Sequence, residues 1–296
     1  MFKRISLMMI VNFGIMITLG IVLSLTGINR YFSAQGLDYT KLLIFCSIYG
    51  FAGSLISLFL SKKMVKWKMK IKTFDSSTAS NQTEKWLYQS VKTMAKKAGL
   101  PKTPEVGIYE SPEMNAFATG PSKSNSLVCV STGLLEQMTQ DEVEGVLAHE
   151  VAHVSNGDMV TMMLLQGIMN TLVMFVSRII AHAITSRGER RSHMMYYMVS
   201  MALDMALGFL GMIVIAYFSR KREFRADQGG AQFSSKTKMV SALEKLQQRF
   251  QPCGVKSEDK IATLKINTSP SRFKALLSTH PPLEDRIKAL KRPRVR

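Results

Sequence analysis

His149-Glu150-Val151-Ala152-His153 is the stretch that decides how this chain is read, because its spacing suits a metal site on a helix. Residues four apart lie on one face of a helix, so His149 and His153 can bind a single Zn²⁺ together. Glu150 lies beside that metal and can accept a proton from a water molecule that the zinc holds. The alternative is a solvent-facing helix with two incidental histidines, and the neighbouring residues favour the metal site.

The residues around this stretch predict a helix over 141–155. Thr139 and Glu142 have the spacing of a capping box, in which each side chain satisfies a free amide of the first turn. Asn156-Gly157 is a stop signal, because both residues tolerate the left-handed conformation that ends a helix. Apolar residues recur between these ends at helical spacing: Val143, Val146, Leu147 and Val151. His-Glu-x-x-His on such a helix is the signature of zinc peptidases.

A catalytic zinc usually has three protein ligands and keeps a further position for water. The best candidate for the third ligand is Glu223, which lies four residues before Asp227 on the same predicted helical face. Asp227 could accept the free ring N–H of a ligand histidine. Spacing alone leaves the alternative open that this is a charged surface helix with an ordinary glutamate.

Here the chain resembles a known family. The histidine motif, the following Asn156-Gly157-Asp158, the later stretch 223–227 and the flanking hydrophobic segments resemble the HtpX family. Members of that family are membrane-bound zinc endopeptidases of the gluzincin type, related to the CaaX prenyl-protease. The resemblance extends over nearly the whole chain, as far as Thr279-His280-Pro281-Pro282.

The resemblance implies a set of roles at the positions that match the motif. It implies zinc ligands at His149, His153 and Glu223, and a general base at Glu150. It also implies polypeptide substrates, in particular misfolded or damaged membrane proteins, and a role in proteolytic quality control and the stress response.

Four segments are long and apolar enough to be membrane spans. Segments 5–28 and 42–60 are expected to be retained membrane helices, since the first has no cleavage site of a signal peptide. Segments 159–183 and 194–218 contain polar residues, which are costly in a bilayer unless they face protein or water. We expect these two to form a second membrane hairpin; the alternative is a pair of amphipathic helices on the membrane surface.

The distribution of lysine and arginine predicts the orientation. Lysines are dense after the second span, over 62–72, and the loop 29–41 has few, so the positive-inside rule places the region after Leu60 in the cytoplasm. Three arginines between 187 and 191 would then lie on the far side, against the rule. We give these arginines less weight, because Glu223 must lie on the same side of the membrane as His149 to share a metal ion with it. The chain between them must therefore cross the membrane an even number of times. We therefore expect a bacterial plasma membrane protein whose active site faces the cytoplasm.

The expected fold class is mainly α with a small β-sheet (α+β): a zincin-like protease domain attached to about four transmembrane helices. After a polar linker at 76–83, the sequence predicts a helix over 84–98 and short strands at 105–109, 116–119 and 126–131. Helix is expected over 225–249, followed by loop over 251–271. The predicted parts are a membrane hairpin (1–62), a cytoplasmic part with the zinc helix (63–158), a second hydrophobic hairpin (159–218) and a cytoplasmic part with the third ligand and C-terminal helices (219–296).

Several other residues are assigned with alternatives. Residues 115–118 resemble the family segment beside the cleft, which implies that Asn115 contacts substrate; the alternative is an ordinary strand with Phe117 in the core. His280 could donate a hydrogen bond to the tetrahedral intermediate, or have no catalytic task. Arg220 could act near the site or anchor the membrane boundary. The formal charge of +18 is explained by lysines against anionic lipid headgroups, and we expect the lipid bilayer as partner and no nucleic acid.

Two rival functions stay open at this point. An intramembrane protease is disfavoured by the polar flanks of the zinc helix, 139–142 and 155–158. A zinc-bearing membrane scaffold that binds partners without cleaving them is disfavoured by Glu150, for which it would have no use.

Overall fold

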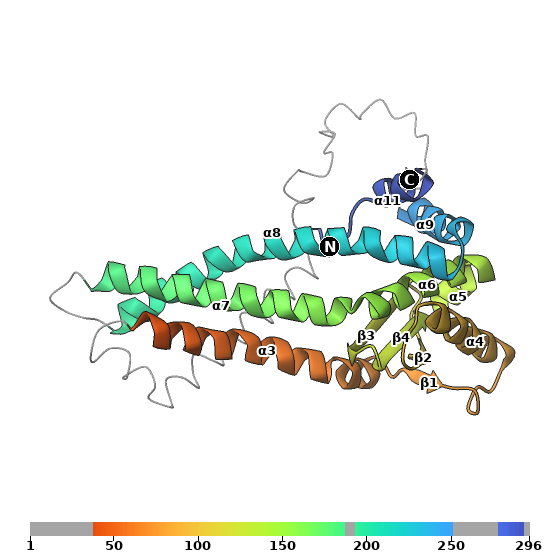
Figure 1. Cartoon of the computed structure of the whole chain (residues 1–296), viewed down its shortest axis with the longest axis horizontal. Coiled ribbons are helices and arrows are strands. Elements are labelled where there is room, and N and C mark those ends of the chain that lie inside the picture. The colour runs from red at the N-terminus through yellow and green to blue at the C-terminus, as the bar shows by residue number, and fades with distance from the viewer. Residues whose placement is uncertain (1–37, 187–192, 251–277, 293–296) are drawn as a thin grey trace, which may run out of the picture. The chain divides into compact units, whose positions relative to one another are not determined.

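The computed structural model describes residues 38–186, 193–250 and 278–292. The chain divides into two compact units, one formed by Met1–Ile56 with Met163–Met212 and the other by Ser57–Met162 with Ile213–Arg296. The described residues are mainly helical and contain one small mixed sheet, which confirms the predicted fold class (Figure 1). The predicted span at 5–28 lies outside the described residues.

Three long helices agree with the other predicted spans: α3 (Tyr39–Lys68), α7 (Asp158–Thr185) and α8 (His193–Phe233). Each has a stretch that is long and apolar enough to cross a membrane, judged by length and composition. Helix α8 continues about four turns beyond the predicted apolar segment 194–218, and this polar continuation carries Glu223.

In the first unit, polar groups of α7 find partners on α7 itself and on neighbouring helices. Asn170 donates to the Gly50 carbonyl of α3 at 3.4 Å and accepts a hydrogen bond from Gln166 at 2.8 Å. Arg178 lies 3.5 Å from the Asp204 carboxylate of α8. Pairing of this kind lowers the cost of placing polar side chains in a membrane segment.

The second unit contains a four-stranded sheet of order β1-β2-β4-β3. Strand β2 (Glu105–Tyr109) pairs parallel with β4 (Asn125–Ser131), and β3 (Ala116–Ser122) pairs antiparallel with β4 at the edge of the sheet. These are the three predicted strands. Strand β1 (Lys72–Phe74) was not predicted, because three residues are too few to show a period-two pattern. It precedes the linker at 76–83, so the folded part begins earlier than predicted.

Helices α4 (Gln82–Lys97) and α6 (Gln140–Asn156) lie within two residues of their predicted bounds. The helices α5 (Thr132–Gln137) and α11 (Leu283–Lys291) complete the unit together with α9 (Lys236–Phe250). A continuous helix over 225–249 was wrong, because α8 ends at Phe233 and Ser235 accepts a hydrogen bond from the Lys238 amide, which starts α9 as a new helix. The loop predicted at 251–271 lies outside the described residues.

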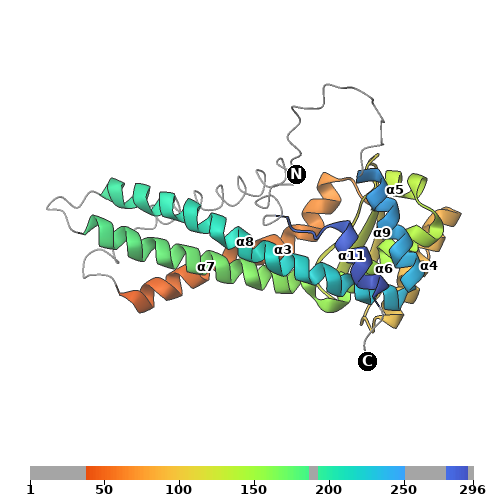
Figure 2. The ribbon, with the colours of Figure 1, turned by 90° about the horizontal axis from the view of Figure 1, so that it is seen from above.

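Helix α6 is the central helix of this unit. It contacts α4, α9 and the strands β3 and β4, and Figure 2 shows it beside α4 and α9. Apolar residues of α6 such as Val143, Leu147 and Val151 are fully buried in the main hydrophobic cluster. Gly145 permits the approach of α9, since a Cβ atom there would lie 2.5 Å from the Lys238 carbonyl oxygen. The position of α6 is therefore fixed from several sides, and so are the side chains that it presents.

Candidate metal centre

The ends of α6 form as the sequence predicts. Thr139 and Glu142 make both hydrogen bonds of a capping box, and Gly157 ends the helix in the left-handed conformation at φ 70°. The helix between them presents His149 and His153 on one face, and both side chains are buried. Local sequence signals are therefore sufficient to place the two histidines together.

The approach of α8 depends on two glycines that follow Asp227. A Cβ atom at Gly229 would lie 2.9 Å from the Ala152 Cβ, and one at Gly230 would lie 3.1 Å from the His149 backbone nitrogen. The first distance is shorter than real Cβ contacts and the second is tighter than most of them, so glycine at both positions lets α8 pack closely against α6. This contact brings the fully buried Glu223 to the histidines.

His149, His153 and Glu223 form a compact triad whose ligand atoms all lie within 4.8 Å of one another. The two Nε2 atoms are 3.1 Å apart, and each lies 3.5 Å from a different carboxylate oxygen of Glu223. Bonds of ~2.0–2.1 Å at tetrahedral angles require ligand atoms about 3.3 Å apart. The spacing of the triad suits one tetrahedral metal ion.

A separate carboxylate holds each imidazole. Nδ1 of His149 lies 2.9 Å from Asp227 Oδ1, and Nδ1 of His153 lies 2.5 Å from Asp158 Oδ2. Both carboxylates are buried and act as acceptors, so each histidine carries its proton on Nδ1. Each Nε2 atom is then left with a free lone pair that points into the triad.

Arg286 on α11 neutralises part of this negative charge. Its guanidinium donates from Nε and Nη2 to the two oxygens of Asp227, at 2.8 and 2.6 Å. The Arg286 side chain is only 7% exposed, so this bidentate ion pair is shielded from solvent. Because Asp227 is held by Arg286 and in turn holds His149, α11 contributes to the orientation of the triad.

The donor set fits a cation. Two imidazole lone pairs face each other at 3.1 Å, which is repulsive unless a proton or a metal ion lies between them. Glu223 Oε1 is buried and makes no hydrogen bond within the part of the chain that the structure describes, although Arg222 Nη2 and His153 Nε2 each lie 3.5 Å from it. An unsatisfied buried carboxylate oxygen is costly, and coordination to a metal would satisfy it.

The pKa values show the same demand for positive charge. Burial disfavours the charged form of His149, but hydrogen bonds to Asp227 and Glu223 raise its pKa to about 9. Burial likewise disfavours the carboxylate of Glu223, yet hydrogen bonds from His149 and His280 hold its pKa well below the usual range. Both shifts favour a positive charge beside Glu223 and Asp227, which a metal ion would also supply.

The sequence also matches a known protein family. Residues 81–294, which contain the whole triad, match peptidase family M48. The chain belongs to this family. It is 47% identical to a protease HtpX homolog of Methylacidiphilum infernorum over 300 residues, which cover 99% of each chain. It is 49% identical to protease HtpX of Pasteurella multocida over 288 residues, covering 97% of each.

A solved structure has a similar fold. The crystal structure of S. mikatae Ste24p matches 93% of this chain with a TM-score of 0.62 at 17% sequence identity. This chain spans 65% of the Ste24p chain, and the likeness shows the fold alone. Together with the M48 match and the apolar helices, the relatives show that the chain is a membrane-bound metalloprotease and confirm its resemblance to the HtpX family.

Glu150 follows His149 on α6 and is half-buried. Its carboxylate has no hydrogen bond or ion pair within the described residues, in contrast to the other acidic groups of this M48 site. A carboxylate next to the triad that is not engaged elsewhere is able to exchange protons with a water molecule.

His280 and Asn115, the other two predicted site residues, have different hydrogen-bond partners. His280 lies at the triad, with Nδ1 2.9 Å from Glu223 Oε2. Asn115 directly precedes β3 and exchanges hydrogen bonds with Ser131, its amide donating to the hydroxyl and its carbonyl accepting from the Ser131 amide. No hydrogen bond joins Asn115 to the triad within the described residues. Phe117 packs against Tyr109, with ring centroids 5.6 Å apart.

Sequence reasoning missed two residues of the site. Asp158 belongs to the polar flank 155–158, but its side chain is buried against His153, so this flank is not evidence that the helix end is exposed to solvent. Its position one residue after the helix stop is a signal that could have been used. Arg286 gave no such signal, because it lies 59 residues beyond Asp227 and only the fold joins them.

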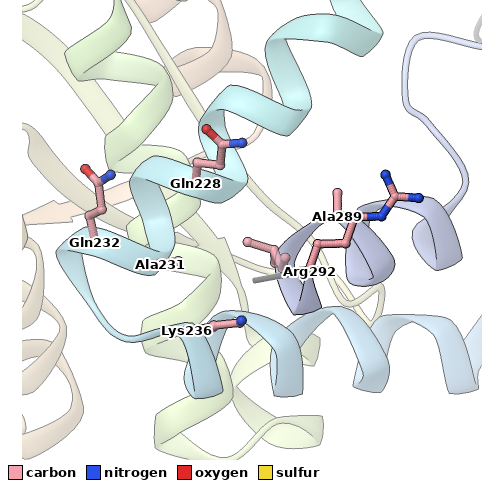
Figure 3. A pocket seen from close by; sticks show the side chains of 7 residues that line it. Gln228, Ala231, Gln232, Lys236, Ala289 and Arg292 are labelled. Atoms are coloured by element: carbon pink, nitrogen blue, oxygen red, sulfur yellow. The ribbon is translucent and has the colours of Figure 1, made fainter. Parts of the chain in front are cut away.

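The second unit also contains a separate cavity of about 350 Å³ between α8, α9 and α11. Figure 3 shows Gln228 and Gln232 on α8 and Lys236 on α9 around it, with Ala289 on α11 and Arg292 directly after that helix. No residue of the triad lines it, so this cavity is distinct from the metal centre.

Proposed function

We propose that the chain is a zinc-dependent endopeptidase in which His149, His153 and Glu223 bind the zinc ion and Glu150 is the general base. The observation that carries the proposal is the convergence of two Nε2 atoms and a buried carboxylate, one oxygen of which has no hydrogen bond among the described residues, at spacings suited to zinc. Two histidines and one carboxylate are also the ligand set of known catalytic zinc sites, which keep a position for water or substrate.

Bound zinc would supply a Lewis acid that polarises the scissile carbonyl and makes water easier to deprotonate. Asp227 and Asp158 hold the two imidazoles and keep their protons on Nδ1. Glu150 accepts the proton of the attacking water and passes it to the leaving amine. Its freedom from other partners in the described residues supports this role.

The substrates are polypeptides, and we propose that they are misfolded or damaged membrane proteins. Strand β3 supports a mode of binding, because it is an edge strand that packs against α6. An extended peptide can add to such an edge through main-chain hydrogen bonds, which would hold it beside the helix that presents the triad. Asn115 precedes this strand and could contact the peptide.

We also propose that the active site faces the cytoplasm across a bacterial plasma membrane, because the lysine-rich residues after α3 favour that side. Single cysteines at exposed positions on either side of the predicted span 42–60 test the orientation. Thr40→Cys should be labelled from outside intact cells by a membrane-impermeant maleimide, and Ser76→Cys should not. The opposite pattern would overturn the cytoplasmic assignment.

The activity is tested with full-length protein purified in detergent. Casein hydrolysis should stop when a chelator removes the metal, and stoichiometric Zn²⁺ should restore it. Metal analysis of the purified protein should give about one zinc per chain. Hydrolysis that is insensitive to the chelator would rule out the proposed mechanism, and stable zinc binding without hydrolysis would favour the scaffold.

A further inference from the structure

Arg220 makes a long-range hydrogen bond close to the metal centre. Its Nη1 atom donates to the Ser278 carbonyl oxygen at 2.7 Å, across 58 residues of sequence. Arg220 lies on α8 three residues before Glu223, so the two side chains share one face of the helix. One face of α8 therefore carries both the Glu223 carboxylate of the triad and Arg220. We call the hydrogen bond from Arg220 to the Ser278 carbonyl the clamp.

The clamped segment carries His280. The Ser278 hydroxyl donates to the His280 carbonyl oxygen at 2.6 Å, which closes a tight turn. At the end of this turn, His280 Nδ1 lies 2.9 Å from Glu223 Oε2. The His280 side chain is 63% exposed, so burial does not fix the position of its ring. Hydrogen bonds must do so.

The segment is held on its other side as well. Pro281 and Pro282 restrict the backbone after His280, and Pro282 directly precedes α11. Helix α11 is fixed by the buried ion pair between Arg286 and Asp227. Arg220 thus provides the anchor on the N-terminal side of the turn, and Arg286 the anchor on the C-terminal side.

We propose that Arg220 is a positioning residue, which holds the Ser278–His280 turn so that the exposed His280 ring stays at the triad during peptide hydrolysis. This inference rests on the proposed function of the triad. Without this hydrogen bond the turn is held only from its C-terminal side, so the His280–Glu223 hydrogen bond must offset more of the conformational entropy of the segment. Since displacements of about 1 Å are costly in catalysis, loss of the clamp should slow turnover.

The competing explanation is that Arg220 only anchors α8 by its charge. An anchor tolerates any cation, whereas a clamp needs a donor that reaches the Ser278 carbonyl. Three variants separate these roles: Arg220→Gln, Arg220→Lys and the matched control Arg225→Gln. Arg225 lies on the same helix, is exposed, and makes no hydrogen bond or ion pair within the described residues.

Full-length proteins in detergent should be compared for zinc content, kcat, KM and hydrogen–deuterium exchange of the peptide that contains 278–285. Arg220→Gln should keep its zinc and a KM close to wild type, lose about 10- to 100-fold in kcat, and exchange faster over 278–280. Arg220→Lys should recover part of the kcat, and Arg225→Gln should match wild type in every measurement. A wild-type kcat in Arg220→Gln, or full recovery with lysine, would overturn the proposal.

Coupling to His280 gives an independent check. The double variant Arg220→Gln/His280→Ala should have the same kcat as His280→Ala, because the clamp has no further effect once the imidazole is gone. Independent, multiplying losses would contradict the proposal, as would a wild-type kcat in His280→Ala. If Arg220→Gln fails to fold, Ser278→Ala tests the same turn and should lower kcat and speed exchange.

The exchange measurement also keeps this inference apart from the proposed function. It can be made on zinc-free protein and does not require turnover. If the wild type neither binds zinc nor cleaves casein, the proposed function fails, while faster exchange in Arg220→Gln would still establish the clamp. If the wild type is an active zinc enzyme and Arg220→Gln leaves the exchange unchanged, the proposed role of Arg220 is refuted and the proposed function is unaffected.

Discussion

His153 and Asp158 lie on opposite sides of the helix stop at Gly157, yet their side chains meet at 2.5 Å between Nδ1 and Oδ2. The left-handed turn at Gly157 bends the chain back, so that the first residue of α7 reaches the last turn of α6. Both side chains are buried. A local turn thus orients one proposed zinc ligand, whereas the other histidine depends on Asp227 from a distant helix.

This pair leads to a first prediction. Asp158→Asn removes the negative charge that fixes the His153 proton on Nδ1, so zinc affinity or kcat should fall about 10- to 100-fold. Competition with a chromogenic chelator measures the affinity. Asp227→Asn provides the comparison, because it removes the corresponding partner of His149. Wild-type zinc affinity and activity in Asp158→Asn would show that the contact has no orienting role.

A second prediction concerns the base. Glu150→Gln keeps the size of the side chain but cannot accept a proton, so zinc should stay bound while hydrolysis falls by several orders of magnitude. Peptide turnover and zinc content should be measured on one preparation. The half-buried Glu144 on the same helix, which pairs with Lys238, offers a control, and Glu144→Gln should retain turnover. Proteolysis that survives in Glu150→Gln would exclude the mechanism.

A third prediction concerns the third ligand. Glu223→Ala leaves two histidines, so metal analysis should show clear loss of zinc and activity should vanish. The expected order of zinc retention is wild type, then Asp227→Asn, then Glu223→Ala. If Glu223→Ala binds zinc as tightly as wild type, the third ligand is elsewhere, and Asp227 is the acidic residue to test next.

A fourth prediction concerns stability. Arg286→Met removes the cation from a buried bidentate pair and leaves the Asp227 carboxylate with the hydrogen bond to His149, so the free energy of unfolding should fall, by up to about 3–5 kcal/mol. Thermal unfolding of the metal-free protein measures the effect. The exposed Lys288–Glu284 pair on the same helix is a control, and Lys288→Met should change stability little. Equal melting temperatures for the two variants would contradict the structural role of Arg286.

Much of the site follows from local sequence. The capping box at Thr139, the stop at Gly157 and the four-residue spacing of His149 and His153 are each properties of a few neighbouring residues. Helix-terminus hydrogen bonds and helical periodicity act over this range, so they can be read from the chain alone. The same holds for the apolar lengths of α3 and α7, which depend on composition.

Other features depended on packing between distant segments. The break between α8 and α9 was missed, since the residues on either side have similar helical character, and Ser235 decides it by capping a new helix. The short strand β1 exists only because β2 offers it a pairing edge.

The remaining parts of the site are tertiary. Glu223 reaches the histidines because Gly229 and Gly230 let α8 approach α6 without side chains between them. Arg286 reaches Asp227, and Arg220 reaches Ser278, across more than 50 residues in each case. A single sequence specifies which donors and acceptors are present. Most buried polar groups must find a hydrogen-bond partner. Which partners are within reach is determined only by the folded chain.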